Sequence, residues 1–336
     1  MRAALVGFGS IGKRHLKELS QRSAEVAVFD INLPDSNVVN LDKNVVFFAD
    51  WSSFAKKVKN YDFAVIATWG PTHESIFAKM AELEIKSILI EKPLESSLRK
   101  IDSITQIAKV HQIRVFENFH LRYSHFKDSL TMLESRYNLG PLLQFNVSGG
   151  AKCLSTTGVH YLDLCEWIND ERPDAVISDL ESNYINPRSD TLLIYGGLAS
   201  WSYPSGFKLT MNFSNSSYSD ATVELLWKNA KGVLTGSVLE LFGPEDFPHF
   251  DSFSTARVKP FHRLLSKFEM IQDSQGRDGM SNLYDAFLNL KEKYRNDSFG
   301  SSTRDLILAL ISSQEARRVS ASEFIQKHNE KEWLIS

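Results

Sequence analysis

Three glycines near the start of the chain, Gly7, Gly9 and Gly12, have the residue type and spacing of a phosphate-binding turn. A short apolar run, residues 3–6, precedes them, and a helix-like pattern follows from Ser10. In such a strand–turn–helix, the first glycine permits a tight turn, the second lets backbone approach a pyrophosphate, and the third lets the helix pack on the strand. The helix N-terminus then favours a phosphate. The sequence therefore predicts a dinucleotide site formed by Gly7, Phe8, Gly9, Ser10, Ile11 and Gly12.

A carboxylate follows the next predicted strand, because Asp30 ends the apolar run of residues 26–29. A carboxylate at this place accepts hydrogen bonds from the adenosine ribose hydroxyls and repels a 2′-phosphate. No arginine lies next to Asp30, which favours NAD over NADP. NADP remains the alternative because the predicted helix begins with two basic residues, Lys13 and Arg14. A second interpretation is that Asp30 only begins the turn of residues 32–35.

The composition indicates a globular protein without an affinity for polyanions. The chain has 336 residues, 43% hydrophobic and 24% charged, with a net charge of −3. This length suits two domains, and this charge gives no general attraction to nucleic acid or anionic membranes. No apolar run approaches the ~18–20 residues of a membrane span, and the strand that follows Met1 leaves no room for a signal peptide. Cys153 and Cys165 lack the spacing of a redox pair or zinc site, so we expect core thiols and a cytoplasmic protein.

Strand and helix patterns alternate over the first part of the chain, as in a doubly wound α/β sheet. We expect a Rossmann domain over residues 1–119. Ligands of such a sheet bind outside the carboxyl ends of its strands, so the residues that follow each strand are the candidates for a site. The predicted strands are residues 3–6, 26–29, 45–48, 63–67, 87–90 and 114–116.

The pattern changes after Phe119, and residues 120–336 are expected to form an α+β domain for substrate binding and oligomerisation. Strand patterns with a period of two, joined by short turns, predict an open antiparallel sheet. The stretch of residues 242–279 is expected to be a long excursion. A C-terminal helix over about residues 302–319 is a candidate to pack back on the first domain.

Further motifs, in order along the chain, resemble those of the Gfo/Idh/MocA oxidoreductases. This family includes glucose–fructose oxidoreductase, inositol dehydrogenases and sugar-nucleotide dehydrogenases. The resemblance covers residues 1 to about 175 well and the rest in outline. The motifs are the glycine turn, Glu91-Lys92-Pro93 after a strand, Phe119-His120-Leu121-Arg122-Tyr123 at the domain junction, and Gly158-Val159-His160-Tyr161-Leu162-Asp163 at a helix start.

The resemblance implies the roles of the site residues. Lys92 is the cation that stabilises a developing alkoxide or polarises a carbonyl, and His160 is the acid/base, to which an imidazole is suited. The residues implied to line the substrate site are Arg122, Tyr123, Thr156, Thr157 and Asp163. Those implied to contact the cofactor, besides the glycine turn and Asp30, are Thr68, Trp69, His73, Glu91 and Lys92.

The chain departs from the family pattern at three places. Thr156 stands where the family usually has an aspartate four residues before the catalytic histidine, and His120 stands where asparagine is frequent. Thr68-Trp69-Gly70 replaces the common Thr-Pro-Asn. Asp163 could partly replace the missing carboxylate one helical turn after His160, or bind a substrate hydroxyl. The competing interpretations are a packing or capping role for His160, and a hinge ion pair and a packing ring for Arg122 and Tyr123.

These observations predict an NAD(P)-dependent dehydrogenase or reductase that acts on a sugar, sugar-nucleotide or cyclitol. One alternative is an NAD-dependent glycosidase of the same family, which oxidises its sugar transiently. Another is a non-catalytic dinucleotide- or sugar-sensing regulator, suggested by Thr156. The expected partners are a small-molecule substrate and further copies of the chain, as a homodimer or homotetramer through the C-terminal sheet. No metal, nucleic-acid or membrane partner is expected.

Overall fold

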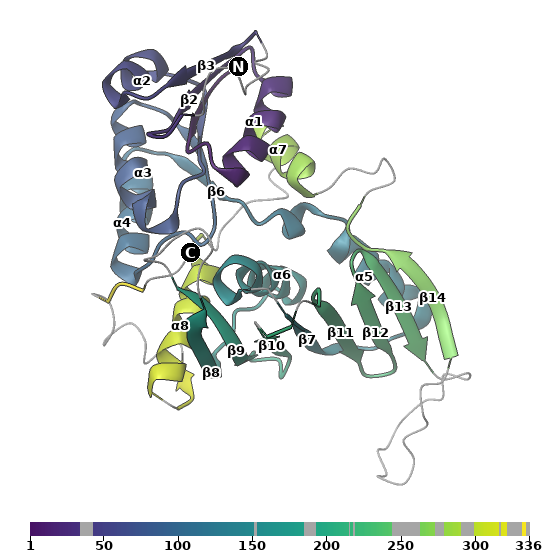
Figure 1. Cartoon of the computed structure of the whole chain (residues 1–336). Coiled ribbons are helices and arrows are strands. Elements are labelled where there is room, and N and C mark those ends of the chain that lie inside the picture. Colours follow the sequence, from purple (N-terminus) through teal and green to yellow (C-terminus); the bar gives the residue numbers. More distant parts are fainter. Residues whose placement is uncertain are drawn as a thin grey trace. The chain divides into compact units, whose positions relative to one another are not determined.

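The structure is a computed structural model (Figure 1). The chain divides into two compact units. The first contains Met1–Asn118, Leu283–Arg304 and His328–Ser336, and the second contains Phe119–Asn282 and Asp305–Lys327. Two segments from the region predicted as the second domain thus belong to the first unit. The structure describes residues 1–33, 43–150, 153–184, 193–214, 216–217, 219–243, 263–272, 279–289, 299–315, 317–320 and 331–333.

The first unit is built on a parallel sheet with the strand order β3-β2-β1-β4-β5-β6. This order reverses between β1 and β4, which is the switch point where doubly wound sheets bind ligands. All neighbouring strands pair in parallel. The predicted Rossmann fold is confirmed, with boundaries that differ by a residue at most. Its strands are β1 (Arg2–Val6), β2 (Glu25–Phe29), β3 (Val45–Phe48), β4 (Phe63–Ile66), β5 (Ser87–Ile90) and β6 (Arg114–Glu117).

Helices cover both faces of this sheet (Figure 1). Two of them begin at side-chain caps: Asp50 accepts a hydrogen bond from the Ser53 amide, and Ser97 accepts one from the Lys100 amide. One face carries α2 (Trp51–Val58), α3 (His73–Glu82) and α4 (Leu98–Val110), and the other carries α1 (Ser10–Arg22) and α7 (Gly279–Asn289). The short 3₁₀ turn η1 (Gly70–Thr72) precedes α3.

The helix α7 is part of this core although it lies far along the chain. The ring of Phe287 lies edge-on to Phe63 and Phe116, with ring centroids 5.4 and 5.2 Å apart. Phe287 is fully buried. Burying a side chain of this size stabilises a fold by about 1.5–3 kcal/mol. The first unit therefore depends on packing between residues more than 170 positions apart in sequence.

The second unit contains a larger sheet with the order β14-β13-β12-β11-β7-β10-β9-β8-β15. Inward positions alternate with outward ones, as in β10, where Leu209, Met211 and Phe213 are buried. Its strands are β7 (Leu142–Gly150), β8 (Ala175–Tyr184), β9 (Ile194–Ser202), β10 (Lys208–Ser214), β11 (Thr222–Trp227), β12 (Lys231–Thr235), β13 (Val238–Gly243), β14 (Arg263–Glu269) and β15 (Val319–Ser320).

The predicted antiparallel sheet is confirmed except at one pair, since β7 and β10 run in parallel. Short turns dictate antiparallel pairing only between strands that follow each other in sequence. A helix and two strands separate β7 from β10, so no turn signal fixes their relative direction. The predicted excursion over residues 242–279 also contains a strand, β14.

Helices of the second unit pack on one face of its sheet (Figure 1). They are η2 (His120–Tyr123), α5 (Phe126–Tyr137), the single π-helical turn η3 (Leu154–Gly158), α6 (Val159–Asn169) and α8 (Ser301–Glu315), of which the part from Asp305 belongs here. Cys153 and Cys165 are buried free thiols, as predicted. The other face presents half-exposed apolar side chains, Ile177, Leu198 and Val238, and its role in oligomer formation stays a prediction. Among the described residues, no helix is long and apolar enough to cross a membrane.

Candidate active site

The turn after β1 can be built only with glycine at two positions. Gly7 has a φ of +97°, and a Cβ there would lie 2.7 Å from the carbonyl oxygen of Ala67. A Cβ on Gly12 would collide with the carbonyl of Gly7. Side chains other than hydrogen are therefore excluded by strain at the first position and by close helix packing at the second.

The middle glycine, in contrast, faces open space. A Cβ on Gly9 would meet no heavy atom within 4 Å, and the residue is exposed. Gly9 is also the N-cap of α1, and its helix start carries no side-chain cap. The first-turn amides of Ser10 and Ile11 are thus orphan donors at a positive dipole end. This arrangement fits a pyrophosphate, because an anion can approach the backbone without meeting a side chain.

The carboxylate of Asp30 is fixed beside this turn. Its Oδ2 accepts a hydrogen bond from the Phe8 amide at 2.6 Å, and its Oδ1 accepts one from the Asn32 amide at 2.8 Å. The second bond supports the turn interpretation, although Pro34 and Asp35 lie outside the described residues. A carboxylate has about four lone-pair sites, so capacity for hydroxyl donors remains. Asp30 can therefore serve both the turn and a ribose.

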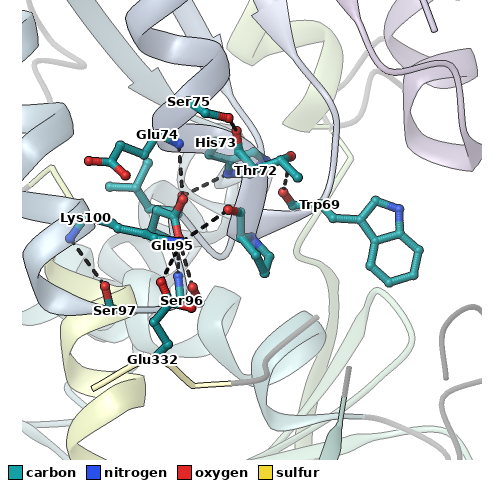
Figure 2. A network of polar contacts seen from close by, with 12 residues as sticks. Trp69, Thr72, His73, Glu74, Ser75, Glu95, Ser96, Ser97, Lys100 and Glu332 are labelled. Carbon is teal, nitrogen blue, oxygen red and sulfur yellow. Dashed lines mark hydrogen bonds and ion pairs between the residues drawn. The ribbon is translucent and has the colours of Figure 1, made fainter. Parts of the chain in front are cut away.

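The loop after β4 presents an exposed indole. Trp69 is 41% exposed, an unusual fraction for tryptophan, and Figure 2 shows it pointing away from the polar network behind the loop. The Thr72 hydroxyl donates to the Trp69 carbonyl at 2.7 Å and lies 2.9 Å from the Thr68 hydroxyl. These bonds hold the loop while leaving the indole free to cover a planar ligand.

His73, predicted to contact a cofactor, is instead fully buried behind this loop (Figure 2). Its Nδ1 lies 2.8 Å from the Leu94 carbonyl and its Nε2 lies 3.1 Å from the Thr68 carbonyl. The imidazole therefore links the loop after β4 to the loop after β5. We correct its role from direct contact to positioning, because a side chain with both nitrogens engaged and no exposed surface cannot reach a ligand.

Figure 2 shows a second buried group in this network, the Glu95 carboxylate. It accepts hydrogen bonds from the amides of Glu74 at 3.1 Å and Ser96 at 2.7 Å. The Lys100 ammonium lies 3.9 Å from the Glu95 carboxylate and 2.8 Å from the Glu332 carboxylate. Next to Glu332 in the chain, the Trp333 amide donates a hydrogen bond to the Ser96 carbonyl. The buried Glu95 carboxylate and its polar and charged contacts thus hold the loop that follows β5 in place.

Glu91 is also buried rather than available to a cofactor. Its Oε1 accepts hydrogen bonds from His15 Nε2 at 2.9 Å and from Asn118 Nδ2, and its Oε2 accepts one from the Lys92 amide at 3.2 Å. Burial alone would raise the pKa of Glu91, but the hydrogen bond and charge of His15 and the charge of Lys92 lower it to about 2. We therefore correct its role to holding the backbone of Lys92.

Lys92 is partly exposed and lies two residues after Ile90, the last residue of β5. Its peptide bond to Pro93 is cis, and the next amide, that of Leu94, donates to the Thr303 hydroxyl at 2.9 Å. The lysine backbone is thus fixed on both sides, by Glu91 before it and by Thr303 after it. The residue lies at the same edge of the sheet as the glycine turn, where the carboxyl ends of parallel strands meet.

In the second unit, Arg122 and Asp163 bind each other. The Arg122 Nη2 lies 2.6 Å from Asp163 Oδ1, and its Nε lies 3.1 Å from both carboxylate oxygens. Both side chains are buried, and the guanidinium stacks 5.1 Å from the Trp167 ring centroid. Burial raises the pKa of Asp163 to about 6, and Arg122 opposes a further rise. The ion-pair interpretation of Arg122 therefore describes this site better than direct substrate binding by either residue.

His160 is the second residue of α6, which follows the π-helical turn η3 directly. It is 8% exposed, and two rings meet it edge-on: His120 with ring centroids 4.5 Å apart, and Phe119 at 5.8 Å. Thr156 and Thr157 in η3 are partly exposed. Isolated π-turns occur frequently at functional sites because they displace one residue from the helical register. Tyr123, the remaining substrate candidate, is 4% exposed and belongs to the core, in agreement with the interpretation as a packing ring.

The comparison with known families can now be made. Residues 1–119 match the model of an oxidoreductase family with an NAD-binding Rossmann fold, GFO_IDH_MocA. This part of the chain belongs to the Gfo/Idh/MocA family. The resemblance predicted from the motifs is confirmed, and so is the NAD-binding type of the fold.

Solved structures of similar fold extend over nearly the whole chain. The WlbA dehydrogenase of Chromobacterium violaceum, in complex with NADH and UDP-GlcNAcA, has a TM-score of 0.70 at 18% identity and covers 95% of each chain. The myo-inositol 2-dehydrogenase of Lactobacillus plantarum has a TM-score of 0.67 at 15% identity, and the match covers 95% of this chain and 99% of that one. The transcriptional regulator Gal80p of Kluyveromyces lactis has a TM-score of 0.71 at 14% identity, and the match covers 96% of this chain and 92% of that one.

The sequence motifs did not reveal all of the residues behind Glu91. Asn118 follows β6 and so lies at a strand end where the sequence predicts site residues, whereas His15 lies on the glycine-turn helix with no spacing that marks it. Tyr284 comes from α7 and carries no signal at all. Its hydroxyl lies 2.7 Å from His15 Nδ1, and all three side chains of the chain Tyr284–His15–Glu91 are buried.

Tyr284→Phe is expected to destabilise the first unit by about 1–3 kcal/mol, because the buried Nδ1 of His15 loses its hydrogen-bond partner while the ring volume is kept. The measurement is the thermal unfolding midpoint, with Tyr137→Phe on α5 of the second unit as the control. Equal midpoints for both variants would show that the hydroxyl of Tyr284 contributes nothing.

Proposed function

We propose that the protein is an NAD-dependent oxidoreductase that transfers a hydride between nicotinamide and a hydroxyl or ketone of a sugar, sugar-nucleotide or cyclitol. The observation that carries the proposal is the placement of Lys92 at the same sheet edge as the open glycine turn. A fixed cation beside a dinucleotide site is what the alkoxide form of a substrate needs.

The residues that would hold the dinucleotide are those of the glycine turn and the loops beside it. The amides at Gly9, Ser10 and Ile11 suit the pyrophosphate, and Asp30 suits the ribose hydroxyls. The exposed Trp69 suits a planar ring. The bound nicotinamide would supply the hydride chemistry.

The chain's own groups would supply charge and proton transfer. Lys92 binds the substrate oxygen and stabilises negative charge there. His160 accepts the proton that leaves this oxygen on oxidation and returns it on reduction. Thr156 and Thr157 donate or accept hydrogen bonds at substrate hydroxyls. Lys92 and His160 belong to different units, so their common action needs a test of its own. If both act on one substrate, the losses of kcat/KM in Lys92→Met and His160→Ala, expressed as free energies, should not add up in the double variant.

The substrate class rests on fold likeness and on the polar residues of η3. Dehydrogenases of the same fold act on, or were crystallised with, a cyclitol or a nucleotide sugar. Partly exposed hydroxyls at Thr156 and Thr157 suit a ring with several hydroxyl groups. Lys152, a candidate contact for an acidic substrate, lies outside the described residues.

The test is turnover with a panel of nucleotide sugars, free sugars and cyclitols, in the presence of NAD or NADP. We expect net NADH formation with one class, and a Kd for NAD at least about tenfold lower than for NADP because Asp30 repels a 2′-phosphate. Cleavage of a glycoside without net NADH would support the glycosidase alternative instead.

A regulator is the second candidate, favoured by Thr156 in place of an aspartate and by the fold likeness to Gal80p. Both candidates predict NAD binding, so binding alone does not separate them. Tight binding of NAD together with no turnover across the whole panel would overturn the enzyme proposal and support the regulator.

A further inference from the structure

The segment from Phe119 to Lys127, which contains η2 and the start of α5, is aligned along α6 by three successive contacts. Phe119 and His120 meet the ring of His160, the guanidinium of Arg122 binds Asp163, and the ammonium of Lys127 lies 4.4 Å from the Trp167 ring centroid. The partners on α6 follow one another at intervals of about one helical turn. The place of His120 beside His160 is therefore fixed by contacts other than its own.

The two imidazoles differ in exposure. His160 is 8% exposed, whereas His120 is only partly buried. Their ring centroids lie 4.5 Å apart with an interplanar angle of 71°. Two positive charges at this separation repel strongly in a site with little water, so protonation of one ring disfavours protonation of the other. The more exposed ring is the better site for the single proton.

The repulsion between the two rings is a pairwise contribution that adds to the effects of the other charges in these elements. Arg122 and Asp163 are bonded to each other, so their charges largely offset at His160. Glu166 lies six residues after His160 on α6, about 9 Å along the helix axis. On α5, which packs against η2, Lys127 and Asp128 are adjacent in sequence and opposite in charge.

We propose that His120 is a positioning residue that keeps His160 in its neutral, proton-accepting form. This inference rests on the proposed function, in which His160 takes the hydroxyl proton of the substrate. In that step the O–H bond breaks and an N–H bond forms on His160, and the proton then passes to solvent, assisted by the neighbouring imidazole. No electrons change hands in this transfer.

The test follows the imidazole C–H resonances of the intact protein by NMR between pH 5 and 9. We expect His120→Asn, which installs the residue frequent in the family, to raise the titration midpoint of His160 by at least about half a pH unit, a threefold change in proton affinity. His125→Asn, an exposed histidine five residues on, is the matched control and should leave the midpoint unchanged. His120→Gln serves as the second variant if the asparagine variant does not fold.

Turnover gives an independent readout. The acidic limb of the kcat/KM profile for oxidation should move to higher pH by the same amount in His120→Asn. An unchanged or lowered midpoint of His160 would overturn the inference even if the wild type is an active dehydrogenase. An absence of turnover with every substrate would overturn the proposed function, while the titration would still decide whether the two rings are coupled.

Discussion

Lys92→Met is expected to lower kcat by at least about 100-fold while leaving the Kd for NAD within about threefold of the wild type. Methionine keeps most of the length and volume of the side chain but removes the cation. The Lys92 backbone is fixed by Glu91 and by the Leu94–Thr303 bond, so the fold of the loop should persist. The loss should fall on the transition state, because negative charge on the substrate oxygen develops there.

Initial rates of NADH formation and a separate NAD titration measure the two quantities. Lys109→Met, at an exposed position of α4, is the control for removing a lysine from the first unit. Lys92→Arg should recover only part of the rate, because a planar guanidinium cannot replace a compact ammonium at one oxygen. Full turnover in Lys92→Met would contradict the role of this residue.

The parts of the site that follow strands were predictable from the sequence. Buried parallel strands are nearly continuous apolar runs, so their ends were visible at Val6, Phe29 and Ile90. The carboxyl ends of parallel strands share one sheet edge, which places Gly7, Asp30 and Lys92 together without further information.

The buried contacts behind these residues were not predictable in the same way. A glutamate after a strand gives no sign of whether its carboxylate faces a ligand or the core, and Glu91 faces His15 and Asn118. Pairing partners far apart in sequence, such as Tyr284 with His15, leave no periodic pattern. The same limit applies to Arg122 and Asp163, where two residues implied to bind substrate satisfy each other instead.

Arg122→Met is expected to destabilise the second unit by about 3–5 kcal/mol, because it leaves the buried Asp163 carboxylate without its cation. For a unit of this size the thermal midpoint should fall by about 10 °C or more at pH 8. The carboxylate can avoid the cost only by taking up a proton, so its pKa in the folded variant should rise above the value of about 6 that it has beside Arg122.

The pH dependence of this loss separates a charge effect from a packing effect. The wild type and the variant share the unfolded-state pKa of about 3.9, so their difference in stability depends on their two folded-state pKa values. The deficit of the variant is complete above its own raised folded pKa and shrinks as the pH falls toward the wild-type value of about 6. The difference in midpoint between wild type and Arg122→Met should therefore be smaller at pH 5.5 than at pH 8. The double variant Arg122→Met/Asp163→Leu removes both members of this buried pair and should regain most of the stability, without the pH dependence that Asp163 gives the single variant. A deficit in Arg122→Met that is equal at both pH values would mean that the guanidinium acts through its packing on Trp167 rather than through Asp163.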